Sequence, residues 1–247
     1  MAKNWVLLLS CEHGGHQIPS AYRPQLLASE HRDLKTHRGW DQGALVVARQ
    51  LQEQLGCSLF AARTSRLFVD LNRSAHHPNC LGASYRKLSV AARDEIFAAY
   101  YHPYRQAVEA ALRDLLQHRD TAVLHLAVHS FTPKLAGVVR EADIGLLYDP
   151  ARASEKRWAD ILQPAFRQEL PALRTRRNYP YQGKSDGFTR HLRGTFPASR
   201  YAGFELEINQ SLLGEVRTQM RLGRALVPIF KPFITSTDFI ETVIFPS

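Results

Sequence analysis

The sequence predicts a single α/β domain over residues 1–247, with a mostly parallel mixed sheet covered by helices on both faces. Apolar, strand-like runs alternate along the chain with segments whose apolar residues recur at helical spacing, which is typical of such a sheet. The 247 residues are enough to bury one sizeable core and need not divide into two domains. No internal repeat, low-complexity segment or linker marks a second domain.

The N-terminal part of the chain already shows this alternation. Residues 6–9 form a short apolar run bounded by turn residues, which indicates a buried strand. A polar loop with a short helical turn follows at 25–35. Apolar residues at helical spacing then predict a helix over 41–55, with Gly56 as its stop, and 57–62 indicates a second strand.

The central part contains the longest helix and the clearest strand. Residues 67–71 are expected to be extended. A long helix is expected over 89–116, with Ser89 as its N-cap and Pro103 kinking or dividing it. Residues 121–128 are almost continuously apolar and rich in β-branched side chains, so they predict a buried strand.

The C-terminal part continues the same pattern and ends in a helix. In order, we expect a strand at 144–148, a helix at 153–169 interrupted at Pro164, a short strand at 173–176, a polar loop at 178–187, a strand at 201–208 and a closing helix at 211–230.

Composition restricts the class of protein. The hydrophobic share of 45% is ordinary for a globular protein, and no apolar run is long enough to span a bilayer. The N-terminus lacks a small-residue cleavage site, so we do not expect a signal peptide. The three cysteines are odd in number and widely spaced, which favours reduced thiols and a cytoplasmic protein.

The net charge of +9 has more than one interpretation. A basic face could bind nucleic acid, but the arginines are scattered and no aromatic-rich RNA-binding signature accompanies them. Arginines close to a catalytic site could instead bind a substrate carboxylate through a bidentate contact. A solvated basic surface accounts for most of the arginines.

Polar residues suited to metal chemistry recur at the ends of the predicted strands. His13 follows the first strand, His129 follows the strand at 121–128, and Glu207 lies within the last strand. Ligands of open α/β sheets bind at the carboxyl ends of strands, and two histidines with a carboxylate form a catalytic zinc site. Gly14 and Gly15 are expected to leave room there for a ligand.

The third metal ligand stays open between two residues. Asp41 is a candidate, but it also stands where a helix begins, and capping a helix is a common use of Asp. His16, three residues after His13, is the other candidate, and its alternative role is that of an exposed loop histidine.

A second cluster of charged residues contains Arg66, Asp70, Asn72 and Arg73. Two arginines and an amide near a metal could bind a substrate carboxylate and polarise a carbonyl, with Asp70 orienting an arginine. The alternative is a structural salt bridge at a turn, which the residues alone slightly favour.

Two further segments complete the candidate site. Glu205 and Glu207 alternate with apolar residues along a strand, so both face one side, where a carboxylate could act as a general base. The alternative for one of them is a solvent-exposed strand face. The polar loop at 179–187, which contains Asp186, is expected to cover the site and contact substrate. Other histidines, such as His125, are expected to be surface or packing residues.

Together these motifs resemble the N-formylglutamate amidohydrolase family. The matching segments are 10–19 (SCEHGGHQIP), 40–44 (WDQGA), 65–73 (SRLFVDLNR), 129–131 (HSF) and 205–210 (ELEINQ), in an order that covers nearly the whole chain. The resemblance implies a zinc-carboxypeptidase-like (phosphorylase/hydrolase-like) fold, which also includes aspartoacylase-type deacylases. It also implies zinc-dependent hydrolysis of an N-acyl amino acid such as N-formylglutamate.

The resemblance also implies roles for particular residues. His13 and His129 match metal ligands, and Asp41 matches an acidic position that makes it the preferred third ligand. In aspartoacylase-like relatives the acidic ligand lies three residues after the first histidine, where this chain has His16, so His16 stays the alternative ligand. The remaining matches are Glu207 to the general base and Arg66, Asn72 and Arg73 to groups that bind the substrate, one arginine stabilising the oxyanion.

These observations lead to one expected activity and two alternatives. We expect one Zn²⁺ or another divalent metal per chain and a small acyl amino acid as substrate. Nucleic acid and membranes are not expected as partners, and the oligomeric state is open. A metallopeptidase or amidase acting on another peptide-like substrate would use the same residues. A non-catalytic nucleic-acid-binding protein ranks lower, because binding alone does not explain His13, His129 and Glu207 at strand ends.

Overall fold

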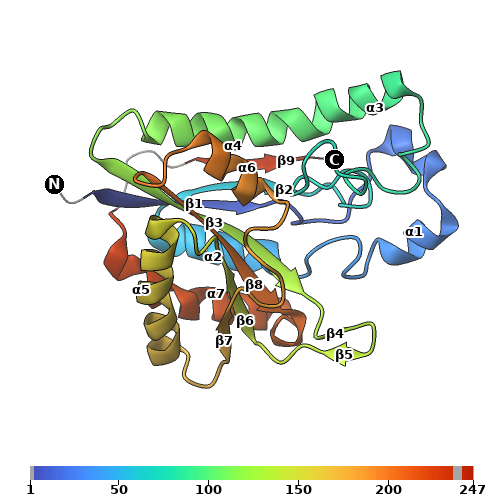
Figure 1. Ribbon diagram of the computed structural model, residues 1–247. Helices are drawn as coiled ribbons and strands as arrows, with labels where there is room; N and C mark the ends of the chain where they lie inside the picture. The colour runs from blue at the N-terminus through green and yellow to red at the C-terminus, as the bar shows by residue number, and fades with distance from the viewer. Residues whose placement is uncertain (1–2, 236–240, 247) are drawn as a thin grey trace.

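The computed structural model describes residues 3–235 and 241–246, which form an α/β fold around a seven-stranded mixed sheet. The strand order is β7-β6-β8-β3-β1-β2-β9, and β8, β3, β1, β2 and β9 run parallel to one another (Figure 1). β6 is antiparallel to β8 and parallel to β7. The strands are β1 (Asn4–Cys11), β2 (Ser58–Ala62), β3 (Thr121–Phe131), β6 (Ile144–Leu147), β7 (Thr175–Arg177), β8 (Tyr201–Asn209) and β9 (Thr242–Phe245).

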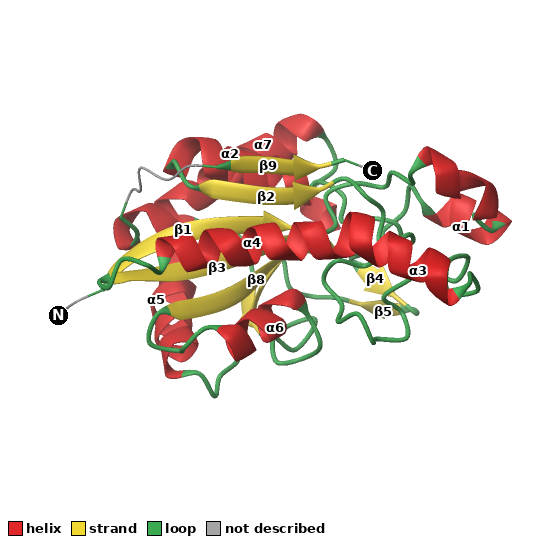
Figure 2. Ribbon diagram, turned by 90° about the horizontal axis from the view of Figure 1, so that it is seen from above, coloured by secondary structure: helices red, strands yellow, loops and turns green. Residues whose placement is uncertain are grey.

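Helices cover both faces of the sheet, as the alternation of elements predicts (Figure 2). One face packs against α2 (Ala44–Leu55), α5 (Ala153–Glu169) and α7 (Val216–Phe230). The other packs against α4 (His102–Leu115) and α6 (Phe188–Thr195). Along β1, Leu7 and Leu9 enter the first core while Val6 and Leu8 enter the second, because successive side chains of a strand point to opposite faces.

The long helical segment after Ser89 is divided close to the expected proline. The Ser89 side chain accepts a hydrogen bond from the Ala92 amide and caps α3 (Val90–Ile96). A π-helical turn at Phe97–Tyr101 then leads into α4, whose first turn contains Pro103. The proline ring cannot donate a backbone hydrogen bond, so the regular α-helical pattern changes just before it.

Two expected features are absent from the structure. Residues 67–71 form turns, and only Val69 makes an isolated bridge, to Leu81. The segment lies over the sheet and contributes Phe68 and Leu71 to the second core, so its apolar residues reflect packing rather than strand formation. Helix α5 is also continuous through Pro164 rather than interrupted there.

Several short elements lack a counterpart in the expected pattern: the helix α6, the edge strand β9, and the hairpin of β4 (Lys134–Leu135) and β5 (Val138–Val139). The expected helical turn in 25–35 is present as α1 (Ala28–Asp33). No helix among residues 3–235 and 241–246 is long and apolar enough to cross a membrane. Cys11, Cys57 and Cys80 are all buried with free thiols.

Candidate active site

The sheet topology brings the candidate residues to one edge. His13 lies just beyond β1, His129 near the end of β3, and Glu207 near the end of β8. These three strands are neighbours and parallel, so their carboxyl ends meet at the same edge of the sheet. His129 and Glu207 are also direct partners in the β3–β8 register, which places them side by side.

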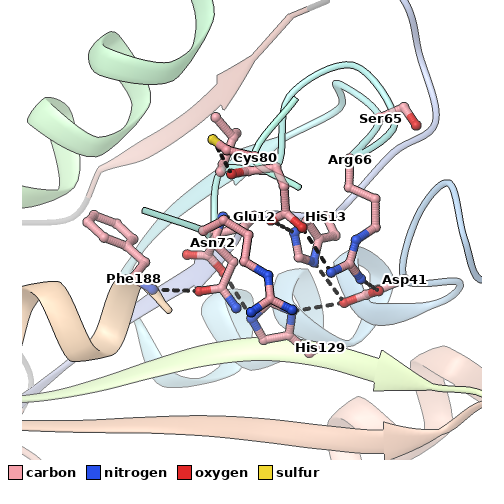
Figure 3. Close-up of polar contacts among 12 residues, drawn as sticks. Glu12, His13, Asp41, Ser65, Arg66, Asn72, Cys80, His129 and Phe188 are labelled. Atoms are coloured by element: carbon pink, nitrogen blue, oxygen red, sulfur yellow. Dashed lines mark hydrogen bonds and ion pairs between the residues drawn. The ribbon is translucent and has the colours of Figure 1, made fainter. Parts of the chain in front are cut away.

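His13, Asp41 and His129 form a compact buried cluster (Figure 3). The Oδ2 atom of Asp41 lies 3.3 Å from His13 Nδ1 and 2.8 Å from His129 Nδ1. Asp41 precedes α2, but the N-cap of that helix is Gly43 and no side chain caps it. The Asp41 carboxylate is therefore turned toward the two imidazoles rather than toward the helix.

The second nitrogen of each imidazole faces another carboxylate. His13 Nε2 is 2.7 Å from Asp70 Oδ1, and His129 Nε2 is 3.1 Å from Glu12 Oε2. Asp70 forms a hydrogen bond and Glu12 an ion pair with the Nε2 atom of its histidine, and such a carboxylate holds the ring in place while the other nitrogen stays free to bind a metal. Both rings consequently direct Nδ1 toward the same point.

The carboxylates around the cluster stabilise positive charge at this point. Burial lowers the pKa of His129, but its contacts with Asp41 and Glu12 outweigh burial and raise that pKa well above its ordinary value. Burial acts to raise the pKa of Glu12, yet the interactions with His129 and Ser10 lower it to about 2. For Asp41, too, the attraction of the histidines and Arg66 outweighs burial, so its pKa is well below the usual range.

The donor set fits a divalent metal ion. One ligand atom from each of His13, Asp41 and His129 lies within 4.8 Å of the other two. Two imidazoles and one carboxylate are the ligand types of catalytic zinc sites, which leave one coordination position open. The carboxylates of Asp70 and Glu12 supply the outer contacts that such ligands usually have.

His16 lies outside this cluster. Its ring contacts the Trp40 ring at 5.0 Å between centroids, and it lines a different cavity. The sequence predicts that the adjacent Gly14 and Gly15 leave room for a ligand, but backbone atoms of the chain itself lie close to both glycines. A Cβ at Gly15 would lie 2.4 Å from the carbonyl oxygen of Arg63, so the pair allows the end of β1 to pass close to the segment after β2.

The two arginines of the second cluster have different surroundings. Arg66 is ion-paired with both Asp41, at 3.4 Å, and Asp70, at 3.0 Å. Burial acts to lower the Arg66 pKa, but these carboxylates raise it above its ordinary value, so the group is fully charged. Arg73 instead donates to the backbone carbonyl of Asp186 at 3.4 Å. The structure thus contains the salt bridge considered from the sequence, but only for Arg66.

Neighbouring groups hold the rest of this region in place. Asn72 Oδ1 accepts a hydrogen bond from the Phe188 amide at 2.7 Å, so the Asn72 NH₂ group is its remaining donor. Asp186 accepts hydrogen bonds from both the hydroxyl and the amide of Ser74, which outweigh burial and lower its pKa. The loop that contains Asp186 is thereby fixed beside Arg73.

Glu205 and Glu207 both face the site, and neither is exposed to bulk solvent as one of them could have been. Glu205 accepts a hydrogen bond from the Thr189 hydroxyl at 2.7 Å. Glu207 Oε2 is buried and has no hydrogen-bond partner among the described residues. Burial and the nearby charges of Asp41 and Glu205 raise the pKa of Glu207 to about 7, against the opposing effect of His129. A carboxyl group in this range can both accept and release a proton near neutral pH.

The metal-binding cluster and most of the charged groups around it line one cavity of about 330 Å³. Its buried base is formed by the metal-binding cluster and Glu207, and Arg66, Asn72, Arg73, Asp186 and Glu205 line it as well. Tyr181 belongs to the polar loop at 179–187 that was expected to cover the site, whereas His37, Phe131 and Leu135, which also line the cavity, were not among the residues expected there. Phe131 stood within a quoted motif, but nothing in the sequence indicated that the hairpin after it carries Leu135 to the mouth of this cavity.

Comparisons with known proteins support the fold. A crystal structure of a gene product from Agrobacterium tumefaciens superposes with a TM-score of 0.79 at 30% identity, over 92% of this chain and 89% of that one. The N-formylglutamate amidohydrolase of Ralstonia eutropha superposes with a TM-score of 0.68 at 22% identity, over 92% of both chains. Among curated proteins no match to the chain is found.

The family comparison covers most of the chain. The family described as N-formylglutamate amidohydrolase matches residues 6–213, a range that begins in β1 and includes every residue assigned to the site above. The fold and the family expected from the sequence motifs are thus both confirmed. The chain belongs to the N-formylglutamate amidohydrolase family of hydrolases.

Proposed function

We propose that the protein is a metal-dependent amidohydrolase that cleaves the amide bond of an N-acyl amino acid, the class to which N-formylglutamate belongs. One observation carries this proposal. The cluster of His13, Asp41 and His129 lines the same cavity as the guanidinium group of Arg73 and the buried carboxylate of Glu207, whose Oε2 atom has no hydrogen-bond partner in the described part of the chain. Family membership supports the reaction class.

In this proposal His13, Asp41 and His129 hold one metal ion, and Zn²⁺ is our candidate because of the two imidazole donors and one carboxylate. When bound, such an ion polarises an acyl carbonyl and lowers the pKa of water to roughly 7. Asp70 and Glu12 orient the two histidines through their Nε2 atoms.

Glu207 is the general base in this scheme. Its carboxylate takes a proton from the attacking water and later delivers it to the departing amine. Its raised pKa suits both steps, because a carboxylate with an ordinary pKa would be a weaker base toward the attacking water, whereas a group with a pKa near 7 can both accept and release the proton. The absence of a hydrogen-bond partner on Oε2, among the residues that the structure describes, leaves that atom available for the proton.

Arg66 and Arg73 have different roles toward the substrate in this scheme. Arg66 is held rigidly by two carboxylates beside the metal-binding cluster, which suits it to stabilise the negative oxygen of the tetrahedral intermediate. Arg73 and the Asn72 amide, further along the cavity wall, bind the substrate carboxylate. We assign the roles in this way because Arg66 is ion-paired with two carboxylates, whereas Arg73, among the described residues, contacts only a backbone carbonyl of Asp186.

The proposal is tested by metal analysis of the purified protein followed by a panel of N-formyl, N-acetyl and longer-chain acyl amino acids, with and without chelator. We expect activity that the chelator removes and added Zn²⁺ restores. His13→Ala and Glu207→Gln should abolish it, whereas His16→Ala, a histidine outside the cluster, should keep it. Absence of a bound divalent metal, or full activity of the first two variants, would contradict the proposal.

A further inference from the structure

The charges that line the cavity limit the number of carboxylates a substrate can carry. The strongly basic side chains among the described lining residues are Arg66 and Arg73. Arg66 is already ion-paired with Asp41 and Asp70, so Arg73 is the guanidinium left to bind a substrate carboxylate. His37 does not add a cation, because burial and the nearby Arg38 and Arg140 lower its pKa.

A second carboxylate on the substrate would meet like charges. Asp186 and Glu205 line the same cavity as Arg73, and the pKa of Asp186 lies below its usual value, so its carboxylate is ionised. Like charges brought together in a partly desolvated site repel each other strongly. This cavity therefore accommodates one substrate carboxylate better than two.

Apolar side chains, rather than further cationic groups, line the mouth of the cavity. Leu135, on the β4–β5 hairpin, and Tyr181, on the loop before α6, line the cavity and are 43% and 44% exposed. Phe131 lines it just below them, at the end of β3. The β4–β5 hairpin projects beyond the end of β3 (Figure 1). Because Leu135 and Tyr181 are partly exposed and line the cavity, they form an apolar wall at its entrance.

Arg140 supports this wall without lining the cavity. Its guanidinium lies over the rings of Phe131, at 5.7 Å, and Tyr181, at 4.9 Å, and it donates to the carbonyl of Thr132 at 3.4 Å. Cation–π contacts of this kind hold an aromatic ring in position. The residue itself is only 9% exposed, so its charge is directed at the rings rather than at a ligand.

We propose that the substrate is an N-acyl amino acid with one carboxylate and an apolar side chain, rather than the dicarboxylate N-formylglutamate. This inference rests on the proposed function and narrows it. The scissile amide lies at the buried base of the cavity, beside His129 and Glu207, and the α-carboxylate binds Arg73. The side chain on the α-carbon then points toward the entrance, where Leu135 and Tyr181 contact it.

The test compares N-formyl-leucine, N-formylglutamine and N-formylglutamate, because glutamine matches glutamate in size without its charge. We expect kcat/KM to fall in that order, with leucine exceeding glutamate by about tenfold or more. N-formylglutamate turned over as well as or better than N-formyl-leucine would overturn the inference while leaving the proposed function intact. Calorimetry with the metal-loaded Glu207→Gln variant measures the affinities for the three compounds directly. The affinities should fall in the same order, and this test does not require that any compound be hydrolysed.

A pair of hairpin variants tests the apolar wall itself. Leu135→Lys places a cation at the cavity wall and should shift the ratio of kcat/KM for glutamate over leucine upward by about tenfold. Val138→Lys adds the same charge on the same hairpin, but Val138 is 67% exposed and does not line the cavity, so the ratio should not change. Equal effects of the two substitutions would show that Leu135 does not contact the substrate.

Discussion

His125, buried under the candidate site, should make the stability of the fold depend on pH. Its imidazole lies in β3 between the hydroxyls of Tyr201 and Ser10, each at 2.8 Å, and it has no exposed surface. Burial lowers the pKa of His125 from 6.5 to about 4, against the opposing charge of Glu12. The ring is therefore neutral in the folded protein at neutral pH.

The sign and size of the effect follow from this difference. In the unfolded chain His125 takes up a proton near pH 6.5, whereas the folded protein takes it up only near pH 4. Between these values the unfolded state binds the additional proton, so the free energy of unfolding falls as the pH falls. The gap between 6.5 and about 4 corresponds to about 3 kcal/mol.

Urea unfolding of the wild type and His125→Gln, at pH values from about 7 down to about 4, measures this contribution. Glutamine keeps one donor and one acceptor for Ser10 and Tyr201 but does not titrate. Other groups titrate in both proteins and cancel in the difference, so the variant should gain about 3 kcal/mol relative to the wild type as the pH falls. His102→Gln, at an exposed position, controls for loss of an imidazole. A difference between wild type and variant that stays constant over this range would refute the reasoning.

Three further predictions concern the candidate site. Asp70→Asn should weaken zinc binding about 10–100-fold in a chelator competition, because His13 loses its charged partner, whereas Asp143→Asn, remote from the cluster, should not. The kcat/KM should rise with pH as Glu207, whose pKa is about 7 before metal binds, loses its proton. A bound cation moves this rise to lower pH. A kcat/KM that is constant from about pH 5 to 8 would contradict the role of Glu207 as general base. Arg73→Lys should raise KM about tenfold with a smaller change in kcat, because a lysine cannot make the bidentate contact; an unchanged KM would remove Arg73 from carboxylate binding.

The sheet and the positions of His13, His129 and Glu207 were predictable because the relevant signals are local. The strands β1 and β3 are nearly continuous apolar runs, and β8 alternates apolar residues with Glu205 and Glu207. Each of the three site residues lies two positions from the end of its strand. Parallel pairing then forces these ends together, whatever the connecting helices do.

The short elements around the site were not predictable in this way. The β4–β5 hairpin has only two residues in each strand, and its turn places Ala136 and Gly137 at positive φ without any of the usual Asn or Asp signals. Strand β9 pairs with β2 from more than 180 residues away and lies at the edge of the sheet. Such elements depend on tertiary packing, which no short window of sequence contains.

The carboxylates that contact the two imidazoles could not be predicted from the local sequence either. Glu12 is adjacent to His13 in sequence, yet it contacts His129, on a different strand. His13 in turn pairs with Asp70, which lies in the turns that follow β2. Adjacent residues at the end of a strand point in different directions, so a neighbouring carboxylate cannot orient the histidine beside it.

The crossed pairing has a consequence for how the site forms. Each imidazole is positioned by a carboxylate from another segment, and Asp41, from a third segment, contacts both. The direction of each Nδ1 atom is therefore decided by the packing of three separate loops rather than by the spacing of ligands along one element. Since the ligand set exists only when these loops are in place, a metal ion that binds it binds the folded state alone and stabilises the contacts between those loops.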